Sequence, residues 1–484
     1  MKTKLAAAAP PVVVVFSFLL SRLLYIRAGL HFDNTPPKYF YQFIDPLLLK
    51  TRFLESIWNL HSQPPLLNFV TGLLYQQFSP QSKIYQLLFL ALGLIFALVL
   101  YWLGLRLGLK LWVSAVLAIW FTISPATVLY ENFYFYSYPT AFLLVFAALT
   151  LSKFLETDNF WWGFGFLSSL AALCLAWAIF HLFWMITIIV LVGVFYRNWR
   201  KLAIVSLIPV LLVAGWYTKN SLLFGTFGAS SWIGMNLSHV TFLSPLTPRS
   251  VDDQLVNQGQ LTTYPIKESF RSIEEYRGLI SKPSPRGIPV LDENIKSTKA
   301  VNFNHTFYIP LSNIMLKDAI RFIRLRPDLY FASVKLGFSI YFHSSSDYLL
   351  LKDKPTPKLE SLWNHVFYGQ LSDYQGNLDN RSKSDPRYIG WLLVIAFVAA
   401  IIYSMEVMIN RNGLDRNFVA VVIFITFTII YFTLMANFFD LGENNRFRFT
   451  IDPLVLLLFV AMLQNWALRL RKKAHLRSVQ MKTG

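Results

Sequence analysis

The sequence predicts an all-α polytopic membrane protein with ten or eleven transmembrane helices, amphipathic interfacial helices in the first outer loop and a mixed outer loop domain. Of the 484 residues, 55% are hydrophobic and only 14% are charged, with a mean hydropathy of +0.45. Soluble globular chains carry about 25% charged residues. The apolar residues gather in blocks of roughly 17 to 25, the length that crosses about 30 Å of hydrocarbon as a helix. An ordinary soluble enzyme is therefore excluded.

Ten apolar blocks define the predicted spans. They cover residues 6–26, 85–105, 111–130, 138–155, 160–178, 180–196, 202–218, 388–409, 417–437 and 450–468. We expect the first block to be a retained span, because it is longer than the hydrophobic core of a signal peptide and contains Arg22. The segment 327–343 is aromatic but short, with Lys335 at its centre. We therefore expect an interfacial helix there instead of an eleventh crossing.

The positive charges give the orientation of these spans. The formal net charge is +18, but the basic residues lie at the ends of the apolar blocks, which argues against a nucleic-acid partner. With both termini on the inner side, about 16 basic residues lie inside and about 7 outside, as the positive-inside rule requires. The single cysteine, Cys174, excludes an intramolecular disulfide and leaves the redox compartment undetermined.

This topology divides the chain into four parts. Residues 1–218 form a transmembrane module that includes a first outer loop at 27–84, and residues 219–387 form a large outer loop domain. Residues 388–468 supply the C-terminal transmembrane helices, and residues 469–484 form a basic inner tail.

The first outer loop contains the first candidate site residues. Asp45 precedes Pro46, a pairing typical of a helix start, with the acid as N-cap and proline at the first helical position. An amphipathic helix is predicted to follow on the membrane surface and to end at the HSQPP run that begins with His61. Asp45 therefore has two open interpretations. It caps the helix, or it removes a proton from an acceptor hydroxyl.

Further polar residues lie where other spans meet the outer surface. Glu131 and Asn132 follow the third span, where an acid needs solvation or a partner. The last outer loop places Glu443, Arg446 and Arg448 immediately before the tenth span. Two arginines on the outer side oppose the positive-inside rule, and they either bind phosphate or form salt bridges. The remaining candidates for substrate contacts are Lys219, Asn220, His305 and Arg324.

Together these motifs resemble the integral-membrane glycosyltransferases of the C superfamily, the group of the protein O-mannosyltransferases and aminoarabinose transferases (families 39 and 83). The strongest features are IDPLLL at residues 44–49 combined with LHSQPPLLN at 60–68. An acid at the end of the third span and the E-N-x-R-x-R pattern at 443–448 add to them. The resemblance covers most of the chain in architecture, although each motif is short.

The resemblance implies an enzyme that moves a sugar from a polyprenyl phosphate-linked donor to a hydroxyl of a lipid, glycan or protein. The reaction is expected at the non-cytoplasmic face of the plasma (inner) membrane, with inversion at the anomeric carbon. Asp45 is then the general base and Glu131 the second acidic residue, while Asp33 competes with Asp45 for the first role.

The same chemistry assigns roles to the basic residues. Lys219, Arg446 and Arg448 are candidates to bind the departing phosphate. His61, Asn132, Asn220, His305, Arg324 and Glu443 are candidates to bind substrate. A divalent cation, Mg²⁺ or Mn²⁺, stays open at Asp45 and Glu131, because arginine and lysine could neutralise the phosphate alone.

Two other functions stay open. A secondary transporter or lipid flippase shares the spans and basic inner loops, but transporters place ionisable groups near mid-membrane, often in inverted repeats. In this sequence the acids and arginines gather at one rim instead, which favours an interfacial enzyme. A membrane scaffold that binds a partner through residues 219–387 leaves the acid and arginine clusters unexplained.

Overall fold

A computed structural model describes residues 2–79, 82–196, 198–262, 268–276, 278–281, 283–351, 355–374 and 385–483, with side chains from Ala9 to Leu476. It is an all-α polytopic membrane protein. Seven helices in these residues are long and apolar enough to cross a membrane. They are α1 (Lys2–Arg27), α6 (Ile84–Arg106), α9 (Ser137–Thr157), α12 (Trp199–Phe224), α19 (Trp391–Ile409), α20 (Arg416–Phe438) and α22 (Asp452–Thr483).

Helices occupy all ten predicted span positions, but three of them are not simple crossings. The third is a pair, α7 (Leu111–Ile123) and α8 (Pro125–Glu131), bent by 61° at Ser124. Pro125, the first residue of α8, has no backbone N–H with which to continue the hydrogen bonding of α7, so the chain changes direction there. The fifth and sixth, α10 (Phe160–Ala176) and α11 (Leu182–Phe195), have 17 and 14 residues and are shorter than a full crossing.

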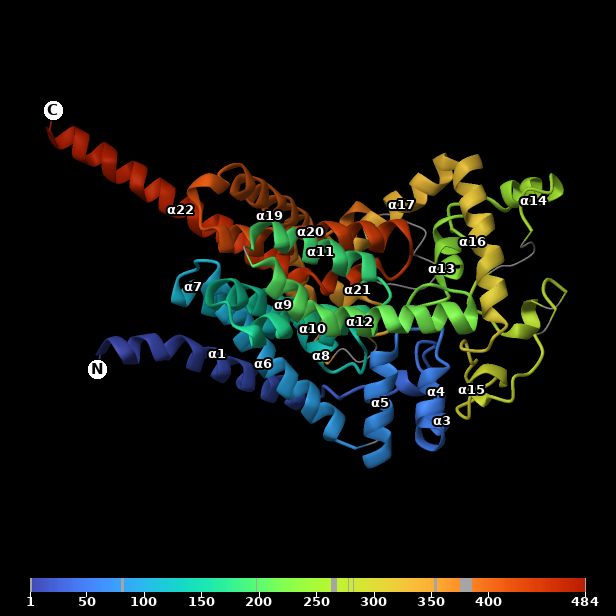
Figure 1. The fold of residues 1–484 in the computed structure, drawn as a ribbon. Coiled ribbons are helices and arrows are strands. Elements are labelled where there is room, and N and C mark those ends of the chain that lie inside the picture. Colours follow the sequence, from blue (N-terminus) through green and yellow to red (C-terminus); the bar gives the residue numbers. More distant parts are fainter. Residues whose placement is uncertain are drawn as a thin grey trace.

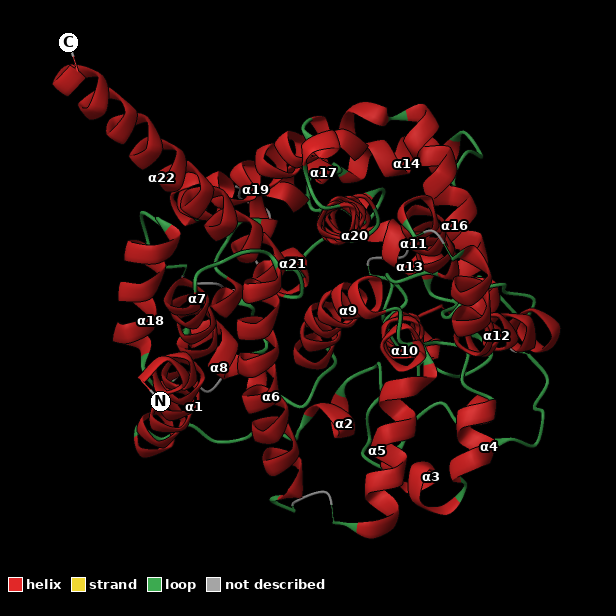
Figure 2. Cartoon of the chain, turned by 60° about the vertical axis from the view of Figure 1, so that its left-hand side comes forward, coloured by secondary structure: helices red, strands yellow, loops and turns green. Residues whose placement is uncertain are grey.

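Both termini lie at one end of the helical bundle, at the left of Figure 1. The short helices of the first outer loop and the helices between residues 233 and 341 gather toward the other end. Figure 2 shows the same bundle from another side, with α9 near its centre and α6, α10 and α20 around it. Helix α9 is packed against α10, α6 and α20, and most of its side chains are buried.

The first outer loop folds into four short helices, α2 (Pro36–Tyr39), α3 (Pro46–Thr51), α4 (Phe53–Trp58) and α5 (Pro65–Gln77). The amphipathic helix predicted after Asp45 exists but breaks at Arg52 into α3 and α4. Their apolar side chains Leu54 and Trp58 remain 72% and 58% exposed. Such a surface fits the membrane interface that the sequence predicts for this segment.

The outer region after α12 consists of helices and loops. Within the described residues the chain forms isolated bridges but no strand. Its helices are α13 (Ile233–Val240), α14 (Arg249–Asn257), α15 (Pro289–Asp292), α16 (Tyr308–Leu325), α17 (Pro327–Tyr341) and α18 (Pro357–Trp363). A separate apolar core forms between α13 and α16, around Trp232, Met235 and Met315.

The segment 327–343 forms α17, which has 15 residues and is not among the helices long enough to cross a membrane. One side of α17 packs on α20 and on the short helix α21 (Asn444–Phe449), while Phe331 on another side is 57% exposed. The basic tail continues α22 without a break and projects beyond the bundle at the end where both termini lie (Figure 1).

Candidate functional site

Asp45 is the N-cap of α3 and is 4% exposed. Its Oδ1 accepts a hydrogen bond from the Leu47 amide at 2.9 Å, as the Asp-Pro pairing predicts. Ser297 from the outer region donates to both oxygens, from its amide at 2.6 Å and from its hydroxyl at 2.5 Å. A general base needs an oxygen within reach of the proton that it removes, and here both oxygens are occupied. The geometry therefore favours the capping interpretation of Asp45.

Lys219 lies away from the two arginines with which the sequence grouped it. Its Nζ donates to the carbonyl oxygens of Trp58 at 3.0 Å and Leu60 at 2.9 Å, and it lies 3.6 Å from the ring centroid of Trp216. Lys219 is 6% exposed. These contacts attach the first outer loop to the end of α12.

His61 belongs to the same junction. Its Nδ1 lies 2.8 Å from the Ser231 hydroxyl and its Nε2 lies 2.9 Å from the Asn304 carbonyl. Burial lowers the pKa of His61 to about 3, so the ring is neutral at physiological pH. Lys296 completes the junction by donating to the carbonyls of Phe40 and Phe43 at 2.9 and 2.7 Å. His61 therefore joins the first outer loop to the outer region.

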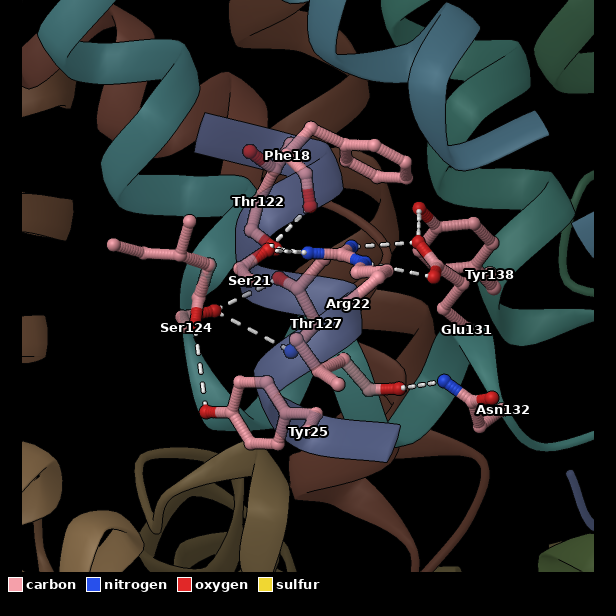
Figure 3. A network of polar contacts seen from close by, with 12 residues as sticks. Phe18, Ser21, Arg22, Tyr25, Thr122, Ser124, Thr127, Glu131, Asn132 and Tyr138 are labelled. Carbon is pink, nitrogen blue, oxygen red and sulfur yellow. Dashed lines mark hydrogen bonds and ion pairs between the residues drawn. The ribbon is translucent and has the colours of Figure 1, made fainter. Parts of the chain in front are cut away.

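Glu131 is paired with Arg22 inside the bundle (Figure 3). Arg22 donates from Nε to Oε1 at 2.9 Å and from Nη2 to Oε2 at 2.6 Å, and the Tyr138 hydroxyl donates to Oε2 at 3.0 Å. Glu131 is 1% exposed and Arg22 4%. The predicted second acid therefore exists as a buried, fully hydrogen-bonded group, and direct contact with substrate is closed to it.

Arg446 is enclosed by aromatic rings. Its guanidinium lies between 4.7 and 5.4 Å from the centroids of five rings, those of Phe135, Tyr136, Trp177, Tyr348 and Phe447. One carboxylate, that of Glu443, binds its Nη2 at 2.5 Å and also accepts from the Tyr348 hydroxyl at 2.8 Å. The salt-bridge interpretation of the last outer loop is therefore confirmed for this arginine.

Arg448 faces a different space. It lines an apolar cavity of about 600 Å³ between α7, α19 and α22, together with Trp112, Val116, Trp120, Ala396, Phe459 and Asp452. Its Nη2 donates to the Ser345 hydroxyl at 2.7 Å, and its Nε lies 3.0 Å from Asp452 Oδ1. Nη1 is buried and has no hydrogen-bond partner among the described residues. Arg448 thus brings a guanidinium, one nitrogen of which is buried without a partner among the described residues, to the edge of a hydrocarbon-lined cavity.

Asp33, the competitor of Asp45, lies in the loop between α1 and α2 and is half-buried. Its amide donates to the Asn132 carbonyl at 2.7 Å and its carbonyl accepts from the Tyr134 amide at 2.9 Å, which forms a parallel bridge. Its Oδ1 accepts from the Thr35 amide at 2.8 Å, and no described residue donates to Oδ2. Asp33 and Asn132 border a notch of about 20 Å³. One carboxylate oxygen therefore remains available.

The segment 345–351 joins the surroundings of Asp33 and Arg448. Ser345 accepts from Arg448, and its carbonyl accepts from the Tyr130 hydroxyl at 3.1 Å. Leu351, at the other end of this segment, borders the notch beside Asp33. The segment thus runs from the arginine at the apolar cavity to the notch beside Asp33.

The other candidates lie elsewhere. Asn220 donates to the Gly228 carbonyl at 2.7 Å and is 1% exposed. His305 accepts from the Phe307 amide at 2.9 Å and is 2% exposed. Arg324 is exposed in the last turn of α16 and lines none of the described cavities. The convergence of all predicted residues on one pocket is therefore not observed.

A divalent cation does not fit Asp45 and Glu131, because their oxygens already accept from Ser297 and Arg22. The described residues contain no group of three or more His, Cys, Asp or Glu side chains that could hold a metal ion.

The sequence did not predict that Ser297 binds Asp45, or that Ser345 and Asp452 bind Arg448. The position of Arg22 did give a signal, because a charge inside an apolar span needs a counter-charge in the bundle. A search for that counter-charge could have led to Glu131. Nothing local marks Ser297 or Ser345, because isolated serines are common in loops.

Comparisons with known proteins give a limited result. No family model matches the chain, and no curated protein matches it. Among solved structures, an archaeal oligosaccharyltransferase, AglB from Archaeoglobus fulgidus in complex with an inhibitory peptide and a dolichol-phosphate, aligns with a TM-score of 0.39 and 13% identity over 99% of this chain. An Archaeoglobus fulgidus oligosaccharyltransferase tethered to an acceptor peptide aligns with a TM-score of 0.40 and 13% identity over 93%. This chain spans about half the length of both, 52% and 49%.

Proposed function

We propose that this protein is a membrane glycosyltransferase that moves a sugar from a polyprenyl phosphate-linked donor to a hydroxyl acceptor. The observation that carries the proposal is the cavity of about 600 Å³ between α7, α19 and α22, with Arg448 at its wall. A hydrocarbon chain is the natural occupant of an apolar space between membrane helices. An anionic head group is the natural partner of the unpaired Nη1 donor of Arg448.

The contacts of Arg448 leave one of its three nitrogens for a phosphate. Asp452 lies beside Nε and partly neutralises the guanidinium, while Ser345 occupies Nη2. His343 follows Phe342 at the cavity wall, and its Nε2 is also buried and unpartnered among the described residues. Burial and the neighbouring Arg448 lower the pKa of His343 to about 4, so its ring is neutral.

The proposed base is Asp33. Its Oδ2 has no donor among the described residues, whereas both oxygens of Asp45 are occupied. In the proposed step the acceptor oxygen forms a bond to the anomeric carbon, and its proton passes to the Asp33 carboxylate. The bond between that carbon and the phosphate oxygen breaks, and polyprenyl phosphate leaves with the electron pair. A single displacement of this kind inverts the configuration, and it requires no carboxylate nucleophile.

The place of these groups in the chain fits a reaction at the membrane surface. Asp33 follows the end of α1, and Arg448 lies in α21, directly before α22. A lipid-linked donor keeps its chain in the bilayer and presents its anomeric carbon at the interface. With the inner side at the termini, the reaction takes place on the non-cytoplasmic face. No step is assigned to a divalent cation.

Mass spectrometry of the lipids that copurify with the protein tests this proposal. We expect a polyprenyl phosphate or its glycoside with the wild type and a loss of that lipid with Arg448→Gln, which removes the charge. Ala396→Trp, which fills the cavity, is expected to have the same effect. The matched control is Arg387→Gln, since Arg387 is exposed and pairs with Asp385 outside the cavity.

A transfer assay with a polyprenyl phosphate sugar then separates the enzyme from the alternatives. Sugar transfer by the wild type, lost in Asp33→Asn, supports the proposal. Movement of a solute or lipid across reconstituted vesicles without sugar transfer favours the transporter or flippase instead and overturns it.

A further inference from the structure

Arg22 and Glu131 form a buried, bidentate ion pair (Figure 3). Besides its two bonds to Glu131, Arg22 donates from Nη1 to the Ser21 hydroxyl at 2.9 Å and to the Thr122 carbonyl at 2.7 Å. The Phe18 ring centroid lies 4.1 Å from the guanidinium. The pair therefore ties α1 to both halves of the bent span, α7 through Thr122 and α8 through Glu131.

The surrounding helices fit closely around this pair. A Cβ built on Gly93 of α6 would lie 2.1 Å from Oε2 of Glu131, and Tyr138 of α9 donates to the same oxygen. Because α6 and α9 close over the carboxylate, Glu131 has no path to a ligand. This position can act only on the relative placement of the helices that meet there.

The same two chain segments meet again at Asp33. From Arg22 the chain runs through the end of α1 to Asp33, and from Glu131 it continues directly to Asn132. There the Asp33 amide donates to the Asn132 carbonyl at 2.7 Å, and the Tyr134 amide donates to the Asp33 carbonyl at 2.9 Å. Glu131 directly precedes Asn132 in the chain. The ion pair therefore fixes the Asn132 side of this bridge relative to α1.

We infer that Arg22 and Glu131 are positioning residues for Asp33. The pair holds the ends of α1 and α8 at the separation at which the bridge forms, and the bridge orients the Asp33 carboxylate toward the acceptor. This inference rests on the proposed function for its catalytic consequence. Its structural consequence, that the bridge depends on the pair, stands independently of the reaction.

The experiment replaces each partner by the uncharged residue glutamine. Glu131→Gln is nearly isosteric, and Arg22→Gln removes the guanidinium. Two quantities are measured on equal amounts of folded protein. The first is the split between kcat and the donor KM in the transfer assay. The second is hydrogen exchange of the Asp33 and Tyr134 amides by mass spectrometry. The matched control is Arg106→Gln, which breaks another arginine–glutamate pair, with Glu156, at the inner end of α6.

We expect kcat to fall about 10- to 100-fold with the donor KM nearly unchanged, because a shift of about 1 Å in a reacting group has this cost. The two amides should exchange about 10-fold faster, since their bridge opens more often. Arg22→Lys keeps the charge but cannot bind both oxygens of Glu131 as the guanidinium does, so it should recover part of kcat. Arg106→Gln should change neither kcat nor the exchange rate. A merely structural pair would lower the folded fraction and leave kcat per folded molecule intact.

Wild-type kcat and wild-type exchange in Arg22→Gln would overturn the inference. If that variant does not fold, Tyr138→Phe removes one hydrogen bond to Oε2 and keeps the pair. It should lower kcat and speed the same exchange by a smaller factor, and no change in either would equally overturn it. If the wild type transfers no sugar, the proposed function fails. Faster exchange in the variants would then still support the dependence of the bridge on the pair.

Discussion

Ser297 donates to both carboxylate oxygens of Asp45, from its amide to Oδ2 at 2.6 Å and from its hydroxyl to Oδ1 at 2.5 Å. This contact joins the start of α3 to a loop 252 residues later in the chain. The acid that the sequence motif singled out therefore fastens the first outer loop to the outer region. The proposed proton transfer passes to Asp33, whose Oδ2 has no donor among the described residues.

The two aspartates give opposite predictions for the same substitution. Asp33→Asn should lower sugar transfer about 10²- to 10⁴-fold, the usual effect of losing a general base. Asp45→Asn should keep transfer within a few-fold and lower stability by about 1 kcal/mol, because asparagine still caps a helix but loses the charge. Initial rates and thermal melting of the purified variants measure both effects. An Asp45→Asn protein that melts normally but transfers no sugar would return the base to Asp45.

Lys219→Met tests whether this lysine binds phosphate or only the first outer loop. The substitution leaves the carbonyls of Trp58 and Leu60 without their donor. We expect a loss of about 1 to 3 kcal/mol of stability for each carbonyl that stays buried, with the donor KM unchanged. Thermal melting and donor titration measure the two quantities. An increased donor KM at unchanged stability would mean that Lys219 reaches the phosphate.

The buried histidine at the junction predicts a pH dependence of stability. Burial lowers the pKa of His61 from 6.5 to about 3. Between these pH values the unfolded chain binds a proton that the folded chain does not. Stability therefore falls as the pH is lowered from 6.5, by up to about 1.4 kcal/mol per unit.

His61→Gln removes this proton uptake and should flatten the decline between pH 6.5 and 4.5, as measured by melting temperature in detergent. Carboxylates contribute equally to both proteins, so the difference between the two curves isolates His61. Parallel curves for the wild type and the variant would contradict a neutral, buried His61.

The surroundings of two glycines predict opposite effects on stability when each is replaced by alanine. A Cβ on Gly234 of α13 would lie 1.8 Å from the Ser312 carbonyl oxygen of α16, whereas a Cβ on Gly215 of α12 meets nothing within 4 Å. Gly234→Ala should therefore destabilise the outer region by about 1 to 3 kcal/mol or more, because backbone must move. Gly215→Ala should be neutral or stabilising, since alanine favours helix. Limited proteolysis of the outer region compares them, and equal resistance would contradict the close packing of α13 on α16.

Local patterns predicted the helices well. Apolar blocks marked all ten span positions, and the Asp45–Pro46 pair marked the start of α3 with its cap. These features depend on hydrophobicity and on hydrogen bonds between near neighbours, which a single segment contains. The break at Arg52 and the helical outer region were not predicted, because contacts with other segments decide them.

The sequence by itself determined that this protein is a bundle of membrane helices with acids and arginines gathered at one rim. Only the tertiary structure decided which of these charges are engaged. It paired Arg22 with Glu131, 109 residues apart, enclosed Arg446 in aromatic rings, and placed Arg448 at the wall of an apolar cavity. The physical reason is that a buried charge must find its partner in space. That partner is set by the packing of distant helices and not by the residues beside it in the chain.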